Sequence, residues 1–186
     1  MNLFVISHNP RQCARYLDNR RQTKMTLETA QLLCNAIHSH CSVTKHEYTP
    51  IKYQKNKIIR GNKIKYKYYF NGVELYSPTH SNHPVSIWAR KNKGNFTWLV
   101  RYFYHMCNEF SNRSGKRHGS QRLLKVFLSA TNNMPLGDRT EFANCARNKE
   151  KGFDFTDTEN VFEAYTNYLE ARFNGDGKFA FSTWVR

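Results

Sequence analysis

Two long stretches with helical spacing of apolar residues constrain the fold of this chain more than any other feature. In residues 20–39 the apolar positions are Leu27, Ala30, Leu33 or Cys34, and Ile37. In residues 93–113 they are Phe96, Leu99, Phe103, Met106 and Phe110. Steps of three and four residues place these side chains on one side of a helix. Each stretch therefore predicts a long helix with one buried face, and two such helices are expected to pack together in a mainly α-helical chain.

Residues 45–76 follow a different pattern. Gly-Asn and Asn-Gly turn pairs separate β-prone runs in KYQKNKIIRGNKIKYKYYFNGVELY, which predicts strands near 56–60, 63–70 and 73–76. In the middle run Lys63, Lys65 and Lys67 alternate with Ile64, Tyr66 and Tyr68. Alternation gives a strand one cationic face and one apolar or aromatic face. We interpret residues 45–76 as a basic β-meander inserted into a helical body.

The remaining segments complete the predicted fold. Residues 2–6 predict a short buried strand, and Asn9-Pro10 and His83-Pro84 predict helix starts with Pro at the first helical position. Further helices are expected over 84–91, 120–129 and 158–173, with a turn of helix near 139–147. The expected fold is thus one compact, mainly α, multi-helix domain over residues 1–186, with a short N-terminal strand and the β-meander insertion.

A large excess of positive charge indicates the partner. The chain has 29 Lys and Arg residues against 14 Asp and Glu, a formal net charge of +15. This excess attracts polyanions, and aromatic residues interleaved with the cations favour nucleic acid over anionic lipid. We expect DNA, with RNA left open. No apolar run is long enough to span a bilayer, and MNLFVISHNPRQ does not look like a secretory signal, so we expect no membrane partner and no secretion.

Cysteines and motifs exclude several classes of site. The five cysteines are scattered without a CxxC pair, which favours reduced thiols. Cys34, His38, His40 and Cys41 lie close in sequence, but no second pair completes a tetrahedral metal site. The sequence also lacks a P-loop, GxGxxG, HExxH and a nucleophile elbow. We therefore expect no metal and no cofactor.

One polar helix face is a candidate for chemistry. Arg21, Lys24, Glu28 and Gln31 recur at helical spacing on the side opposite the apolar stripe. Lys24 and Glu28 are four residues apart and should be neighbours. A carboxylate beside an amine can act as an acid or base, or hold an amine nucleophile ready. The alternative is a solvated helix face with one ion pair.

Three other groups are candidates for binding nucleic acid. Trp98, Tyr102, His105 and Glu109 form a second stripe on the 93–113 helix, continued by Arg113, Lys116 and His118, which could stack on bases and hold phosphates. The alternative is that Trp98 and Tyr102 pack in the core. The lysines Lys63, Lys65 and Lys67 could contact phosphates, or protect a sheet edge from aggregation. In the third group, His83 shares a turn with His80 and could be a metal ligand, a base or a phosphate donor. Arg90, about two helical turns beyond His83, and Arg21 on the polar helix face are candidate phosphate contacts.

The motifs in this chain resemble a family of small phage-encoded proteins. The resemblance is carried by MNLFVISHNPRQCARYLDNRRQTKMTLETAQLL, THSNHPVSIWARKNKGNFTWL and CNEFSNRSGKRHGSQ. The corresponding family patterns are MNIFVLDxDPxxAAxxLxDKxVVKMILExAQLL, NHPxxIWxR followed by NxxWL, and EYxxRYGKxH. The resemblance covers most of residues 1–34 and 79–121, and the β-meander is additional. Some members are labelled as similar to the pyrimidine-dimer DNA glycosylases of the endonuclease V type.

That resemblance implies a compact, mainly helical fold and a particular chemistry. A base is flipped from the duplex, an amine attacks the sugar to form an imine, and a glutamate on an early helix assists. Glu28 stands where such a carboxylate is expected. The enzyme class uses an N-terminal amine exposed by removal of methionine, but here Met1 precedes Asn2, whose size disfavours removal. The resemblance therefore implies the Met1 amine or Lys24 as the nucleophile.

Three functional hypotheses follow. The first is a phage DNA-processing protein, a base-excision glycosylase/lyase with Glu28 as its catalytic carboxylate and Lys24 or Met1 as its nucleophile. The second is a non-catalytic protein that binds nucleic acid or inhibits a host factor. The third is an enzyme that alters phage DNA bases without breaking strands. The host cytoplasm is the expected location for all three.

Overall fold

The computed structural model describes residues 2–54, 57–60 and 64–175. Its helices are α1 (Pro10–Arg15), α2 (Asn19–His40), α3 (Pro84–Lys91), α4 (Lys93–Ser114), α5 (Leu124–Ala130) and α6 (Val161–Gly175), with short 3-10 turns at Gly119–Leu123, Thr131–Asn133 and Lys149–Lys151. Its strands are β1 (Thr44–Tyr48), β2 (Ile51–Gln54), β3 (Lys57–Arg60), β4 (Lys65–Phe70), β5 (Val73–Leu75), β6 (Arg147–Asn148) and β7 (Phe153–Asp154). The mainly α prediction with a small β insertion is confirmed.

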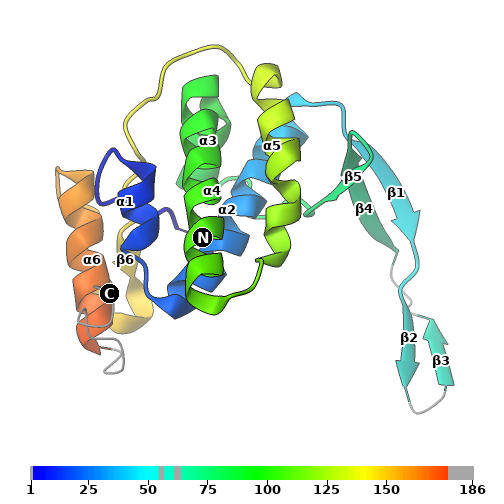
Figure 1. Cartoon of the computed structure of the whole chain (residues 1–186), viewed down its shortest axis with the longest axis horizontal. Coiled ribbons are helices and arrows are strands. Elements are labelled where there is room, and N and C mark those ends of the chain that lie inside the picture. The colour runs from blue at the N-terminus through cyan, green and yellow to red at the C-terminus, as the bar shows by residue number, and fades with distance from the viewer. Residues whose placement is uncertain (1, 55–56, 61–63, 176–186) are drawn as a thin grey trace.

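The long helices pack as their apolar spacing predicts. Helix α4 contacts α1, α2 and α3, and its residues Phe96, Leu99, Phe103 and Met106 are fully buried. Helix α6 lies at one end of the helical body, beside α1 and β6, and the β-meander projects from the opposite end (Figure 1). The predicted stripe of α2 is correct except at Leu27, which is exposed.

The β-meander contains the predicted strands and two more. Antiparallel pairing gives the order β1-β4-β5, and β2 and β3 form a separate hairpin. Asn71 and Gly72, with φ of 49° and 74°, make the predicted Asn-Gly turn between β4 and β5. The ring of Tyr68 on β4 contacts the ring of His38 on α2 edge-on, with centroids 4.8 Å apart. This contact helps to attach the sheet to the helical body.

The predicted N-terminal strand is wrong in one respect. Leu3, Phe4 and Val5 are buried as expected, but residues 2–5 pair with no strand. Instead the ring of Phe4 packs against two tyrosines of α6, with centroids 5.8 Å from Tyr165 and 5.5 Å from Tyr168. A short apolar run predicts burial, but it does not reveal whether its neighbour is a strand or a helix.

The segment between α5 and α6 also differs from the prediction. Residues 139–146 contain no helix, because side chains of other elements bond to their backbone. The Asn95 side chain accepts from the Thr140 N–H at 2.8 Å, and the Tyr165 hydroxyl donates to the Ala143 carbonyl at 3.1 Å. Helix α6 begins at Val161 rather than 158, because Asn160 accepts from the N–H groups of Phe162 and Glu163.

Candidate functional site

The first turn of α2 is held by a buried aspartate. Asp18 is fully buried and caps the helix by accepting from the Arg21 N–H at 2.7 Å. The Arg21 guanidinium also bonds to the Asp18 carboxylate and lies over the Phe173 ring, 5.3 Å from its centroid. Arg21 is therefore fixed between the cap of its own helix and α6.

The predicted neighbours Lys24 and Glu28 are paired one turn further along α2. Lys24 Nζ lies 3.4 Å from Glu28 Oε1. The Lys24 side chain is 71% exposed, whereas the Glu28 side chain is 16% exposed. The carboxylate is thus set back into the molecule while the amine reaches toward solvent. This arrangement departs from a simple solvated helix face, in which both groups would be exposed.

Glu28 lines a cleft of about 280 Å³. The residues around it come from the N-terminal segment, α2, β6 and α6: Asn2, Phe4, Arg20, Arg21, Lys24, Met25, Glu28, Asn148, Tyr168 and Arg172. Four of these carry positive charge and one carries negative charge. A concave site with this balance attracts anions. We call it the Glu28 cleft.

A second hollow adjoins the Glu28 cleft through Asn2, which lines both. Its lining includes His83, Arg147 and Thr156. His83 caps α3 as predicted, with Nδ1 accepting from the Val85 N–H at 3.3 Å. Burial lowers the pKa of His83, and the negative charge of Glu28 partly opposes this shift. His83 is therefore neutral near pH 7, and because Nδ1 accepts, its proton is on Nε2.

Trp98 and Tyr102 are core residues, which corrects the prediction that they stack on bases. Tyr102 is 0% exposed and Trp98 is 7% exposed, and their rings stack with centroids 5.4 Å apart. The Trp98 indole N–H donates to the His8 carbonyl at 2.8 Å. A buried ring has no open face for a nucleobase. The packing alternative therefore holds for this half of the α4 stripe.

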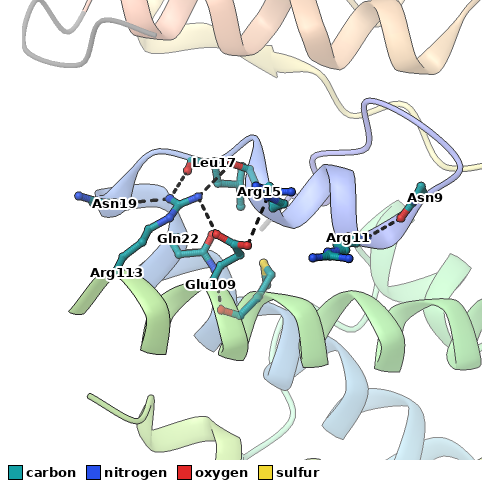
Figure 2. A network of polar contacts seen from close by, with 9 residues as sticks. Asn9, Arg11, Arg15, Leu17, Asn19, Gln22, Glu109 and Arg113 are labelled. Carbon is teal, nitrogen blue, oxygen red and sulfur yellow. Dashed lines mark hydrogen bonds and ion pairs between the residues drawn. The ribbon is translucent and has the colours of Figure 1, made fainter. Parts of the chain in front are cut away.

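Glu109 and Arg113, on the next turns of α4, hold the connection between α1 and α2 (Figure 2). Arg113 donates to the carbonyls of Leu17 at 2.6 Å and Arg15 at 2.9 Å. Glu109 lies 3.3 Å from Arg113 and 3.6 Å from Arg15. Burial lowers the pKa of Arg113, and the charge of Glu109 offsets part of this shift. The Arg113 guanidinium, predicted to hold a phosphate, thus donates inside the protein instead, because the carbonyls of Arg15 and Leu17 at the α1–α2 turn accept its hydrogen bonds.

The other predicted binding residues of the helical body lie outside the Glu28 cleft, and two of them make hydrogen bonds within the protein. His118 Nδ1 accepts from the Ser120 N–H at 3.1 Å, and Arg90 donates to the Ser81 carbonyl at 2.6 Å. Burial lowers the pKa of His105. Lys116 is exposed in the turn after α4. None of these four residues lines the Glu28 cleft, so their contact with nucleic acid stays a prediction.

The predicted lysines of the β-meander have different surroundings. Lys65 is exposed on β4. Lys67 pairs with Glu74 at 3.1 Å, and this hydrogen-bonded carboxylate raises the pKa of Lys67. Lys63 lies outside the described residues. A phosphate contact through these lysines therefore remains a prediction, and of the two described ones Lys65 is the more exposed.

Sequence reasoning missed several residues of the Glu28 cleft. Arg20 adjoins Arg21 in sequence, so the basic start of α2 signalled it. Asn148, Tyr168 and Arg172 lie more than a hundred residues from Glu28, and no local spacing links them to it. Met1, the predicted alternative nucleophile, lies outside the described residues, although Asn2, to which it is bonded, lines the cleft.

The described part of the chain contains neither a candidate metal site nor a candidate membrane span. Among residues 2–54, 57–60 and 64–175, no three His, Cys, Asp or Glu side chains are grouped to hold a metal ion. Within the same residues, no helix is long and apolar enough to cross a membrane.

A family model described as pyrimidine dimer DNA glycosylase matches residues 1–123 of the chain. The matched stretch contains Lys24, Glu28 and His83 and ends before β6 and α6. No curated protein and no solved structure matches the chain.

Proposed function

The chain belongs to the pyrimidine dimer DNA glycosylase family, and we propose that it excises a base from DNA through an amine nucleophile assisted by Glu28. The observation that supports this proposal is the Glu28 cleft. There a carboxylate that is 16% exposed lies 3.4 Å from an amine, surrounded by further cations from two helices. Glycosylases that flip a nucleotide need such a recess for the nucleotide and positive charge for its phosphates.

The proposed reaction runs through an imine. The amine nitrogen bonds to C1′ of the deoxyribose while the C1′–N bond to the base breaks, and the base leaves with that electron pair and takes up a proton. Glu28 accepts a proton from the attached amine and delivers it to O4′ as the sugar ring opens. The nitrogen lone pair then forms the C=N bond. Loss of a C2′ proton expels the 3′ phosphate, and water releases the amine.

Two amines are candidates for the nucleophile. Lys24 lies beside Glu28, but its amine is engaged in an ion pair with that carboxylate at 3.4 Å. The other candidate is the α-amine of Met1, which is bonded to the cleft residue Asn2. We propose the Met1 amine as the nucleophile, with Lys24 as its cationic neighbour. Peptide mass mapping of a borohydride-reduced adduct separates the two, because the adduct would lie on the N-terminal peptide or on the Lys24 peptide.

The test of the catalytic proposal is borohydride trapping on two duplexes, one with a single abasic site and one with a pyrimidine dimer. We expect the wild-type protein to form a covalent adduct, and Glu28→Gln to slow its formation by about 100-fold or more. Glu159 is an exposed carboxylate outside the cleft. Glu159→Gln is therefore the matched control and should trap at the wild-type rate. Absence of a wild-type adduct on both duplexes, or equal rates for the two variants, would contradict the proposal.

A further inference from the structure

One wall of the Glu28 cleft comes from a part of the chain that the family model does not match. Asn148 follows Arg147 on β6, and Tyr168 and Arg172 lie one turn apart on α6. The family model ends at residue 123. The lining residues from α2, which include Arg20, Lys24 and Glu28, lie within the match. The cleft is therefore incomplete without the C-terminal segment.

This wall is attached firmly to the rest of the protein. Tyr168 is 6% exposed, and its ring stacks on Phe4 with centroids 5.5 Å apart and planes 26° from parallel. Arg147 and Asn148 pair with Phe153 and Asp154 in a two-stranded ladder. The positions of Asn148 and Tyr168 are thus set by packing and by hydrogen bonds. A preorganised wall is what a binding residue needs to hold its partner at a fixed place.

The chemistry of the wall suits an anion with several oxygens. Asn148 Oδ1 accepts from the Lys151 N–H at 3.3 Å, so its amide nitrogen carries two hydrogens that can be donated to another acceptor. Arg172 adds a guanidinium, whose planar donors match the oxygens of a phosphate. Arg20 and Lys24 of α2 line the same cleft and supply further charge. Residues with donor groups from α2, β6 and α6 therefore line the recess.

We propose that Asn148 and Arg172 bind a phosphodiester of the DNA strand whose nucleotide enters the Glu28 cleft. This inference rests on the proposed function, since it names the part of the substrate that the C-terminal wall contacts. The wall then belongs to the substrate-binding site rather than to the scaffold. The C-terminal segment fixes how the damaged strand lies against Glu28.

The sharpest test is Asn148→Asp, which keeps the oxygen that caps the 149–151 turn and replaces the amide donor with a negative charge. Asn160→Asp is the matched control. Asn160 caps the start of α6 in the same way and lines a different hollow. Affinity is measured on a duplex with one tetrahydrofuran abasic analogue, which cannot form an imine. The measurement therefore reports binding alone, independent of the proposed chemistry.

We expect Asn148→Asp to weaken binding by about tenfold and Asn160→Asp by less than about twofold. Arg172→Gln should also weaken binding and lower the slope of log affinity against log salt by about one, and Arg172→Lys should restore most of that slope. Equal affinities for the two aspartate variants would overturn the inference, whether or not the wild-type protein traps covalently. Failure of the wild-type protein to form a borohydride-trapped adduct would instead contradict the proposed function.

Discussion

Replacing Arg113 should destabilise the protein without weakening its binding to DNA. In the structure the guanidinium donates to the Leu17 carbonyl at 2.6 Å, in a part-buried position, and to the Arg15 carbonyl at 2.9 Å, in a more exposed one. Its side chain is 21% exposed. A hydrogen bond from a charged group contributes about 1.5–3 kcal/mol when partly buried and less when exposed. The pair with Glu109, an (i, i+4) pair, adds about 0.5 kcal/mol.

The sum predicts that Arg113→Met lowers the free energy of unfolding by about 3 kcal/mol. For a chain of this length such a loss lowers Tm by about 6–12 °C. Arg117→Met, an exposed arginine four residues away, is the control and should change stability by less than about 0.5 kcal/mol. Thermal unfolding and DNA affinity are measured on both variants, the latter well below Tm. The reasoning is refuted if Arg113→Met melts like Arg117→Met while its DNA affinity falls tenfold, because the guanidinium would then be a phosphate contact.

Three further perturbations test other parts of the structure. Gly94→Ala should lower the free energy of unfolding by about 2 kcal/mol or more in a urea titration, because the added Cβ would clash with the backbone of Arg139. Gly119→Ala is the control, since its Cβ would meet no atom within 4 Å. Burial lowers the pKa of His118, so the unfolded chain binds a proton more readily, and stability should fall as pH drops below about 6.5. His118→Asn keeps a capping acceptor and should make that fall shallower. Lys65→Glu should weaken DNA binding several-fold without changing the rate of covalent trapping. An unchanged affinity would show that Lys65 of the β-meander does not contact DNA.

The helices and the hairpin turn were predictable because their signals are local. Apolar spacing gave α2 and α4 within about two residues of their ends, a margin usual for helix boundaries. The Asn71-Gly72 pair gave the β4–β5 turn, since both residues tolerate positive φ. Strand β1 was missed because Thr44–Tyr48 is exposed throughout and has no alternation that marks a buried face. Pairing with β4, which local sequence does not encode, makes it a strand.

The second stripe of α4, which runs from Trp98 to Glu109, shows what helical spacing can and cannot predict. Spacing placed Trp98, Tyr102 and Glu109 on one side of the helix, and they do lie on one side. What covers that side changes along the helix axis. The rings of Trp98 and Tyr102 meet the core, whereas Glu109 meets the polar turn between α1 and α2. The choice between core packing and base stacking therefore depended on tertiary neighbours that spacing cannot supply.

The same limit explains why only three of the ten residues that line the Glu28 cleft were found from sequence. Arg21, Lys24 and Glu28 share one helix, so their spacing alone predicts that they are neighbours. Arg172 reaches the same cleft from α6, and its position depends on Tyr168 stacking on Phe4 at the other end of the chain. The burial of an N-terminal apolar segment thus decides where a C-terminal cation lies. A change at Phe4 should therefore alter DNA binding in two ways, because Phe4 itself lines the Glu28 cleft and because its stacking on Tyr168 positions the helix that carries Arg172.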